Sequence, residues 1–376
     1  MFETTKKLLD EFERIGIPGF DLSVWQNGKE VFREMRGVSD EKGTAMTGKE
    51  KYNIYSCSKV FTCVAAMMLI EEGKMRLDDE LALYLPAFAD MKVKQAGAIV
   101  KTEKRITLFH LFTMTAGLNY SLREEPILRG KAETEGKAPT VEMMKYLAEV
   151  PLDFEPGTTW QYSLCHDVLA AVVEVVSGKR FGEFVKERIL DPLGLKNTTF
   201  LLPEEEVPTL MDQYAYKDVE GIYKNIGKNI WAYKLGSLYE SGGAGGISTV
   251  DDYVRFLEGI RTGKLLNEES IALMSKDHLR DDQRATCWVS NGYGYGLGVR
   301  TPKAGFSKRT DFGWGGAAGA FAAIDKEKEL SVYYAQHVLT APTRNLRKDI
   351  IEAVKLDLGY PAFEEDMWKG TGSSLA

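Results

Sequence analysis

The clearest chemical signal in the sequence is a serine and a lysine three residues apart, Ser56 and Lys59. Residues at this spacing share one face of a helix, so the hydroxyl and the amine can meet. A serine becomes a nucleophile when a neighbouring base accepts its proton. The helix expected at Ser56–Glu72 is apolar on nearly all sides, which predicts that it is buried. Burial disfavours the charged form of a lysine, and this suits Lys59 to the role of base.

The same spacing occurs a second time, at Ser39 and Lys42. Ordinary residue frequencies predict roughly one or two such pairs in a chain of this length. The second pair lies in a charged loop with no apolar helix behind it, so we interpret it as chance. The buried helix distinguishes Ser56 and Lys59, and the sequence predicts a serine hydrolase.

A third candidate is Tyr162, which follows the turn Glu155-Pro156-Gly157 and precedes an expected helix at His166–Ser177. This position could place a phenol over a cleft. The Tyr-Ser pair is a weak signal because it also occurs at Tyr55 and Tyr120. A packed tyrosine with a satisfied hydroxyl is the alternative at this point.

A glycine-rich run, Gly313-Trp314-Gly315-Gly316-Ala317-Ala318-Gly319, separates two expected strands and would let the backbone approach a ligand closely. It also fits a nucleotide-binding fingerprint, but a strand follows it where a helix is needed. Residues 43–50 nearly match a P-loop, yet Glu50 stands where a magnesium-binding serine or threonine is required. No G-x-S-x-G elbow is present, which disfavours an α/β-hydrolase triad.

Composition excludes several other classes of protein. The 376 residues carry a formal net charge of −7 without a Lys/Arg-rich stripe, so neither nucleic acid nor an anionic membrane surface is an expected partner. No apolar run approaches the roughly 20 residues of a membrane span, and no signal peptide is apparent, so a cytoplasmic location is expected. The four cysteines and four histidines lack metal-ligand spacing, and we expect neither a metal nor a cofactor. The oligomeric state stays open.

The elements that must position these residues begin and end with strands. A helix is expected at 3–15, then strands Phe20–Gln26 and Lys29–Met35 joined by Asn27-Gly28, which favours a type I′ turn. The last hundred residues predict four strands, a final helix and a disordered tail. These strands are Gly294–Arg300, Lys308–Trp314, Gly319–Asp325 and Glu329–Gln336; the helix is Thr343–Leu358 and the tail follows Tyr360.

The middle of the chain predicts helices separated by proline and glycine. These helices are Leu108–Thr115, Val141–Val150, His166–Ser177, Phe181–Ile189 and Val250–Thr262. Residues 119–140 are expected to be a surface loop, and this loop and 203–240 are expected to shape the cleft. The order predicts an α+β fold in which both chain ends form one antiparallel sheet, flanked by the terminal helices. Residues 1–60 and 286–376 would form this α/β lobe and residues 61–285 a mainly helical lobe. Together they make a single catalytic unit with the active site in the cleft between the lobes.

Taken together, these segments resemble the serine β-lactamase and penicillin-binding protein superfamily, in its class C-like branch. Ser56-x-x-Lys59 stands at the first motif of that family. Several further stretches match in the correct order over nearly the whole chain: 106–118, 77–79 with 84–86, 154–157, 191–195 and 245–249 with Asp251-Asp252. The resemblance implies a β-lactamase/transpeptidase-like fold and an acyl-enzyme at Ser56.

The resemblance also implies roles for the other candidates. Lys59 and Tyr162 would share the proton transfers, and it leaves open which of them is the base at each step. The backbone N–H groups of Ser56 and Ala317 would form the oxyanion hole, in which losing one donor typically costs about 100- to 1,000-fold in rate. Trp314, Gly315, Gly316 and Leu164 would contact the substrate.

Two departures from the family pattern affect the expected substrate. Leu164 replaces the usual asparagine of the second motif, which removes a side-chain amide for gripping a substrate amide. Trp314 begins the third motif where lysine or histidine is usual, which removes a cation for a substrate carboxylate. Both changes are similar to the family VIII carboxylesterases, which carry Tyr-Ser-Leu and Trp-Gly-Gly.

We therefore expect an esterase for small or medium acyl esters. A β-lactamase, a D-Ala-D-Ala carboxypeptidase or a related D-amino-acid peptidase is the alternative hydrolase, with an amide as its small-molecule substrate. A non-turnover penicillin-binding sensor is the alternative outside the enzymes.

Overall fold

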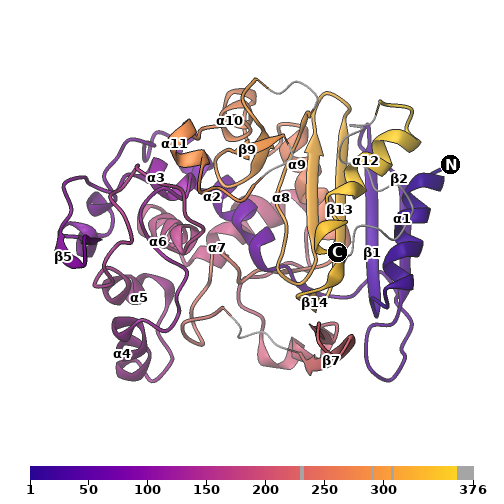
Figure 1. The fold of residues 1–376 in the computed structure, drawn as a ribbon, viewed down its shortest axis with the longest axis horizontal. Helices are drawn as coiled ribbons and strands as arrows, with labels where there is room; N and C mark the ends of the chain where they lie inside the picture. The colour runs from indigo at the N-terminus through magenta and orange to yellow at the C-terminus, as the bar shows by residue number, and fades with distance from the viewer. Residues whose placement is uncertain (229–232, 290–291, 306–308, 362–376) are drawn as a thin grey trace.

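A five-stranded antiparallel sheet built from both ends of the chain organises the molecule (Figure 1). The computed structural model describes residues 1–228, 233–289, 292–305 and 309–361, so the predicted tail lies almost wholly outside the described residues. The strand order is β11-β12-β13-β1-β2. The strands are β1 Gly19–Gln26, β2 Lys29–Gly37, β11 Asp311–Phe312, β12 Phe321–Asp325 and β13 Leu330–Gln336. The predicted α+β class and the sheet formed from both chain ends are confirmed.

The N-terminal hairpin has the turn that its sequence predicts. Asn27 and Gly28 both have positive φ, 53° and 73°, which a type I′ turn requires. On its other edge β1 pairs with β13, so that Phe20 faces Gln336 and Gln26 faces Leu330. The first strand of the chain therefore lies inside the sheet, next to one of the last.

Helices cover both faces of this sheet. The terminal helices α1 (Glu3–Arg14) and α12 (Asp349–Asp357) share one hydrophobic core with one face of the sheet. The carboxylate of Asp357 accepts hydrogen bonds from the backbone N–H groups of Thr4 and Thr5, at 3.0 and 2.7 Å. The helix α9 (Val250–Arg261) packs against the opposite face.

The remaining helices surround α2 (Ser58–Glu71), whose residues from Ser58 to Leu69 are all buried. This confirms the buried helix behind Ser56. The others are α3 Leu108–Phe112, α4 Glu125–Glu133, α5 Thr140–Leu147, α6 Cys165–Ser177, α7 Phe181–Val185, α8 Asp191–Leu193, α10 Glu268–Met274 and α11 Asp281–Arg284. Within the described part of the chain, no helix combines the length and apolarity that a membrane crossing requires.

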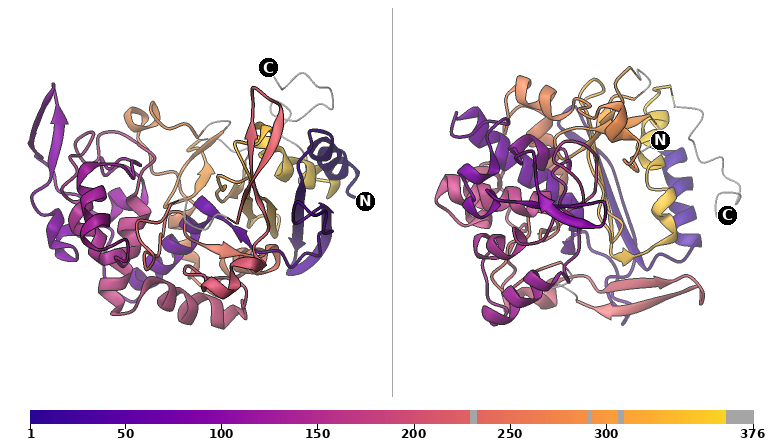
Figure 2. Two further views of the ribbon diagram at one scale, coloured as in Figure 1. Left: turned by 90° about the horizontal axis from the view of Figure 1, so that it is seen from below. Right: turned by 60° about the vertical axis from the view of Figure 1, so that its left-hand side comes forward.

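Several small sheets complete the fold. They pair β3 Tyr52–Asn53 with β8 Ile247–Ser248, β4 Lys92–Gln95 with β5 Ala98–Lys101, β9 Tyr293–Tyr295 with β10 Arg300–Pro302, and β6 Gln213–Lys217 with both β7 Ile222–Gly227 and β14 Val338–Leu339. The hairpins β4–β5 and β6–β7 project from the body of the molecule (Figure 2).

Two predicted strands near the C-terminus are wrong in extent. The strand expected at Gly294–Arg300 is split into β9 and β10, because the chain between them turns at Gly298 with φ 74°. A side chain at Gly298 would lie 2.1 Å from the sulfur of Cys63, so this turn is pressed against α2. Only Asp311–Phe312 of the expected strand Lys308–Trp314 is a strand, and Lys308 lies outside the described residues.

Three other expectations also need correction. Residues 119–140 contain the helix α4, which has Pro126 in its first turn. It buries only Ile127 and Gly130, too few residues to give a helical period. Residues 203–240 contain the hairpin β6–β7, and the exposed β7 gives little apolar signal. The final helix begins at Asp349 because the chain before it, Pro342–Asn345, forms a 3-10 turn.

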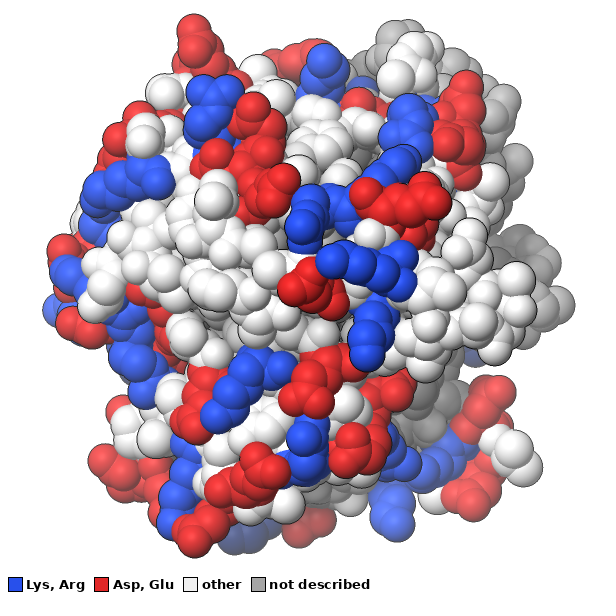
Figure 3. Space-filling model, turned by 90° about the vertical axis from the view of Figure 1, so that its left-hand side faces the viewer, with Lys and Arg blue, Asp and Glu red and all other residues white. Residues whose placement is uncertain are grey.

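The division into lobes at residues 60 and 286 stays a prediction. The largest hydrophobic core joins α2, α5 and α6 to α9 and to one face of the sheet, so α9 packs on the sheet although it falls within 61–285. On the face shown in Figure 3, acidic and basic side chains are interspersed and form no stripe of one sign.

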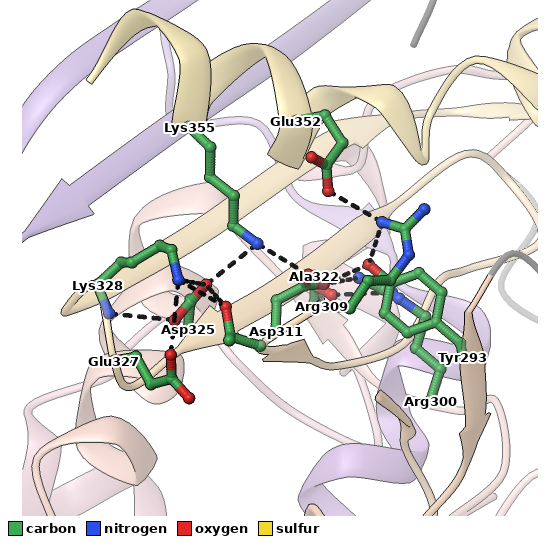
Figure 4. A network of polar contacts seen from close by, with 11 residues as sticks. Tyr293, Arg300, Arg309, Asp311, Ala322, Asp325, Glu327, Lys328, Glu352 and Lys355 are labelled. Atoms are coloured by element: carbon green, nitrogen blue, oxygen red, sulfur yellow. Dashed lines mark hydrogen bonds and ion pairs between the residues drawn. The ribbon is translucent and has the colours of Figure 1, made fainter. Parts of the chain in front are cut away.

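A buried network of charges ties α12 to the strand that leads to Trp314 (Figure 4). Asp311 is completely buried and contacts Lys355 at 3.1 Å and Arg300 at 3.2 Å. Lys355 also contacts Asp325 at 3.1 Å, and the hydroxyl of Tyr293 donates to Asp311 at 2.7 Å. Burial alone would raise the pKa of Asp311, but Lys355 and Arg300 outweigh it and hold the pKa well below its usual value.

We predict that Asp311→Asn lowers the free energy of unfolding by about 3–5 kcal/mol at pH 7, because Arg300 loses its carboxylate partner and Lys355 keeps only Asp325. A lowered carboxyl pKa stabilises the folded state at a pH above its ordinary value of about 4. The difference between wild type and variant should therefore shrink as the pH falls below about 4. Urea unfolding at several pH values measures both effects.

Asp90→Asn is the matched control, since it removes an ion pair with Lys101 in which both side chains are largely exposed. It should cost about 1 kcal/mol or less. Equal losses for the two variants would contradict the importance of the buried network.

Candidate active site

Ser56 lies in a 3-10 turn, Tyr55–Cys57, immediately before α2. Tyr55 has a φ of 46°, in the left-handed region that side chains rarely adopt. Its hydroxyl accepts a hydrogen bond from the Gln213 side chain at 2.5 Å. Strained backbone of this kind persists where its surroundings hold it, and it is often found at functional sites. Here it turns the chain so that Ser56 is partly exposed at the start of a buried helix.

Lys59 is completely buried one turn further along. Its Nζ donates to the carbonyl oxygen of Gly243 at 2.6 Å and to Ser56 Oγ at 3.3 Å. The same nitrogen lies 4.7 Å from the ring centroid of Tyr162 and 5.4 Å from that of Tyr120. A buried amine needs such partners because it has lost its water. The partners hold the amine beside the serine hydroxyl.

Tyr162 reaches Ser56 from the segment before α6. Its hydroxyl donates to Ser56 Oγ at 2.5 Å. Its ring stacks between Tyr120 and Trp314, at centroid distances of 5.3 and 6.1 Å. The fold thus brings two of the predicted side chains, Lys59 and Tyr162, within hydrogen-bonding distance of the Ser56 hydroxyl, although Tyr162 is 106 residues from Ser56. Their catalytic roles stay predictions.

The third motif lies beside the turn that carries Ser56. A side chain on Gly316 would lie 2.5 Å from the carbonyl oxygen of Ile54, so only glycine allows this approach. The N–H of Gly316 donates to the Ala320 carbonyl at 2.8 Å, and Ala317 is exposed at the tip of this turn. Within the residues described, neither the Ser56 nor the Ala317 amide donates to a protein acceptor. That these two amides form an oxyanion hole stays a prediction.

The predicted substrate contacts occupy different positions around this turn. Trp314 is 4% exposed and forms a wall behind Tyr162, while Gly315 is partly exposed. Leu164 is only 2% exposed. Its backbone N–H donates to the Asn119 carbonyl at 3.1 Å, so it helps to hold the start of α6. A direct contact between the Leu164 side chain and a substrate stays a prediction.

Sequence reasoning missed several residues of the site. Trp288 is 58% exposed, and its ring lies 5.6 Å from the rings of both Tyr162 and Trp314. Tyr120 packs on Tyr162, and Gly243 supplies the acceptor for Lys59. These three residues come from distant segments without a shared motif. The glycine run at 242–246 was the one signal in the sequence, because consecutive glycines indicate close packing of backbone.

The histidines do not join this constellation. His110 caps α3 by accepting from the N–H of Thr107 at 3.1 Å. His166 is completely buried on α6, and burial lowers its pKa well below the usual value, so it is neutral. Among the described residues no group of three or more histidine, cysteine or acidic side chains could hold a metal ion.

Comparisons with known proteins identify the family of the chain. A family model described as Beta-lactamase matches residues 5–355. The esterase EstB of Burkholderia gladioli is 29% identical over 336 residues, covering 82% of this chain and 83% of EstB. A putative D-alanyl-D-alanine carboxypeptidase of Escherichia coli strain K12 is 23% identical over 367 residues, covering 89% and 82% of the two chains.

The solved structures agree at the level of the fold. EstCE1, described as a hydrolase with promiscuous acyltransferase activity, superposes with a TM-score of 0.75 at 26% identity. The match covers 93% of this chain and 99% of EstCE1. The chain belongs to the beta-lactamase family and has the fold of its hydrolases.

Proposed function

We propose that this protein hydrolyses carboxylic esters through an acyl-enzyme formed on Ser56. The observation that carries the proposal is the position of Ser56 Oγ, 2.5 Å from the Tyr162 hydroxyl and 3.3 Å from Lys59 Nζ. A nucleophile in contact with two groups that can exchange protons is the arrangement that acyl transfer requires. The relative EstB is named as an esterase, and EstCE1 is described as a hydrolase with promiscuous acyltransferase activity, which supports the proposal.

The reaction would proceed in two steps. Ser56 Oγ attacks the ester carbonyl and its proton passes to the Lys59/Tyr162 pair, while the amides of Ser56 and Ala317 donate to the carbonyl oxygen as it becomes negative. The carbonyl–alkoxide bond then breaks, and the pair returns the proton to the leaving alcohol. Water attacks the acyl-enzyme in the same way and releases the acid and Ser56.

The surroundings of the pair favour esters over β-lactams and peptides. Leu164 offers no side-chain amide, and Trp314 offers no cation where this family usually presents one. Tyr120, Tyr162 and Trp288 provide ring surface at the opening instead. Such a site suits a neutral substrate with apolar groups on the ester.

We predict that Ser56→Ala lowers kcat/KM for p-nitrophenyl butyrate by at least about 10⁴-fold, because the nucleophile is lost. Wild type should also gain the mass of the acyl group on the peptide that contains Ser56 during rapid-quench mass spectrometry. Ser39→Ala is the matched control, since it removes the serine of the second, exposed S-x-x-K sequence and should leave activity unchanged. Full activity in Ser56→Ala would reject the proposed nucleophile.

We further predict that wild type hydrolyses p-nitrophenyl butyrate at least about 100-fold faster than nitrocefin in kcat/KM, because polar groups for the β-lactam are missing. Steady-state kinetics with both substrates measures this ratio. Faster nitrocefin hydrolysis would favour a β-lactamase, and release of D-alanine from a D-Ala-D-Ala peptide would favour a carboxypeptidase. Stable labelling by fluorescent penicillin without ester turnover would favour a sensor.

A further inference from the structure

A glycine-rich segment, which we call the glycine loop (Ser241–Gly246), lies behind the buried amine of Lys59. The Gly243 carbonyl is nearer to Lys59 Nζ than Ser56 is, at 2.6 against 3.3 Å. One turn along α2, Thr62 donates to the Gly242 carbonyl at 2.7 Å. Two consecutive carbonyls of the glycine loop therefore bind the helix that carries Lys59, and they fix where its amine lies.

The glycine loop is pressed just as closely against α6. A side chain on Gly242 would lie 2.5 Å from the His166 carbonyl oxygen. A side chain on Gly243 would lie 2.2 Å from Asp167 Oδ2 and 3.5 Å from Lys59 Nζ. Gly243 thus stands directly between the carboxylate of Asp167 and the amine of Lys59, and only glycine lets both approach.

Asp167 is buried, with 1% exposure, and it holds the start of this segment. Its Oδ1 accepts from Ser241 Oγ at 2.6 Å and from the Tyr239 hydroxyl at 3.0 Å. Ser241 Oγ in turn accepts from the N–H of Ala244 at 3.0 Å. Asp167 therefore determines the shape of the loop that supplies the acceptor for Lys59.

Asp167 is also distinct in charge among the titratable groups near Lys59. Those that face Lys59 or feel its charge in the described structure are Cys57 just before α2, Cys63 on α2, Cys165, His166 and Asp167 on α6, and the rings of Tyr120 and Tyr162. Burial raises the pKa of the three thiols to about 11 or above and lowers that of His166, so these groups are neutral. Asp167 is the one carboxyl group among them. Burial raises its pKa, while the hydrogen bond from Ser241 and the charge of Lys59 oppose that shift and favour the charged form, which can balance a buried lysine.

We propose that Asp167 is a positioning residue for the reaction, acting through the glycine loop to hold the amine of Lys59 against Ser56 and to balance its charge. This inference rests on the proposed function of Ser56 and Lys59. This role explains how a charge can lie between the apolar helices α2 and α6. It also explains why the loop beside that charge is rich in glycine. Asp167 itself contacts neither Ser56 nor the substrate.

Two variants test separately the charge of Asp167 and the hydrogen bond from Ser241 by which it holds the glycine loop. Asp167→Asn keeps the shape and the acceptor for Ser241 but removes the charge. Because a nearby negative charge favours the protonated form of a catalytic base, its removal should move the acidic limb of the kcat/KM–pH profile to lower pH by about one unit. Ser241→Ala keeps the charge but releases the loop, so the plateau of kcat should fall by about 10- to 100-fold without movement of the limb.

Thr140→Val is the matched structural control. Its hydroxyl anchors the neighbouring residue Glu240, accepting from its N–H at 2.9 Å and donating to its carbonyl at 3.1 Å, without contact to Asp167. This variant should lower the melting temperature while the pH profile stays that of wild type. Thermal unfolding of all variants shows which of them fold.

The rate at which a fluorophosphonate probe labels Ser56 is the second readout, because it reports the reactivity of the serine without a cognate ester. Wild type that neither labels nor hydrolyses esters would reject the proposed function. If wild type labels, an unchanged pH profile and labelling rate in folded Asp167→Asn would overturn the role of Asp167. A Thr140→Val profile that moves as much as that of Asp167→Asn would overturn it as well.

Discussion

The burial of one amine, that of Lys59, is the constraint on which the rest of the site depends. An amine without water must find acceptors and negative charge within a few ångströms, or it destabilises the fold. The carbonyl of Gly243, the rings of Tyr120 and Tyr162 and the carboxylate of Asp167 meet that need. These groups come from separate parts of the chain. The contacts that stabilise the buried amine therefore also bring together the residues that surround Ser56.

The sheet imposes a second constraint, because it fixes the position of the third motif, Trp314-Gly315-Gly316. The turn at Gly315–Ala317 is fixed where β11 ends, and β11 is held by the buried ion pairs of Asp311 with Lys355 and Arg300 (Figure 4). Gly316 then meets the backbone of Ile54 just before the nucleophile. Both backbone segments are therefore held in place by rigid elements, and the proposed oxyanion hole would depend on that rigidity.

Local patterns in the sequence predicted the parts of this fold that local forces determine. The Asn27-Gly28 turn, the strands of the N-terminal hairpin and the apolar α2 each follow from short-range preferences, and each is confirmed. The family motifs predicted Ser56, Lys59 and Tyr162, which the fold brings into contact. Their chemistry stays a proposal.

The sequence could not show what depends on tertiary packing. Helix α4 buries too few side chains to reveal its period, and Gly298 interrupts a strand only because Cys63 lies behind it. Trp288 and Asp167 belong to the site through contacts with segments far away in the chain. A periodic sequence pattern shows which face of a single helix or strand is buried. The places of these residues depend on contacts among two or three elements, so no such pattern reveals them.

The joining of β1 to β13 has a consequence for how the protein forms. Thr4 and Asp357 are hydrogen-bonded although 353 residues separate them, so the first helix and strand emerge from the ribosome long before their partners exist. Contacts of such long range are slow to form and leave strand edges open in the meantime. Ser56 and α2 lie early in the chain, whereas the turn at Gly316 that packs on Ile54 is made more than 250 residues later. The surroundings of Ser56 are therefore complete only when the last strands have joined the sheet.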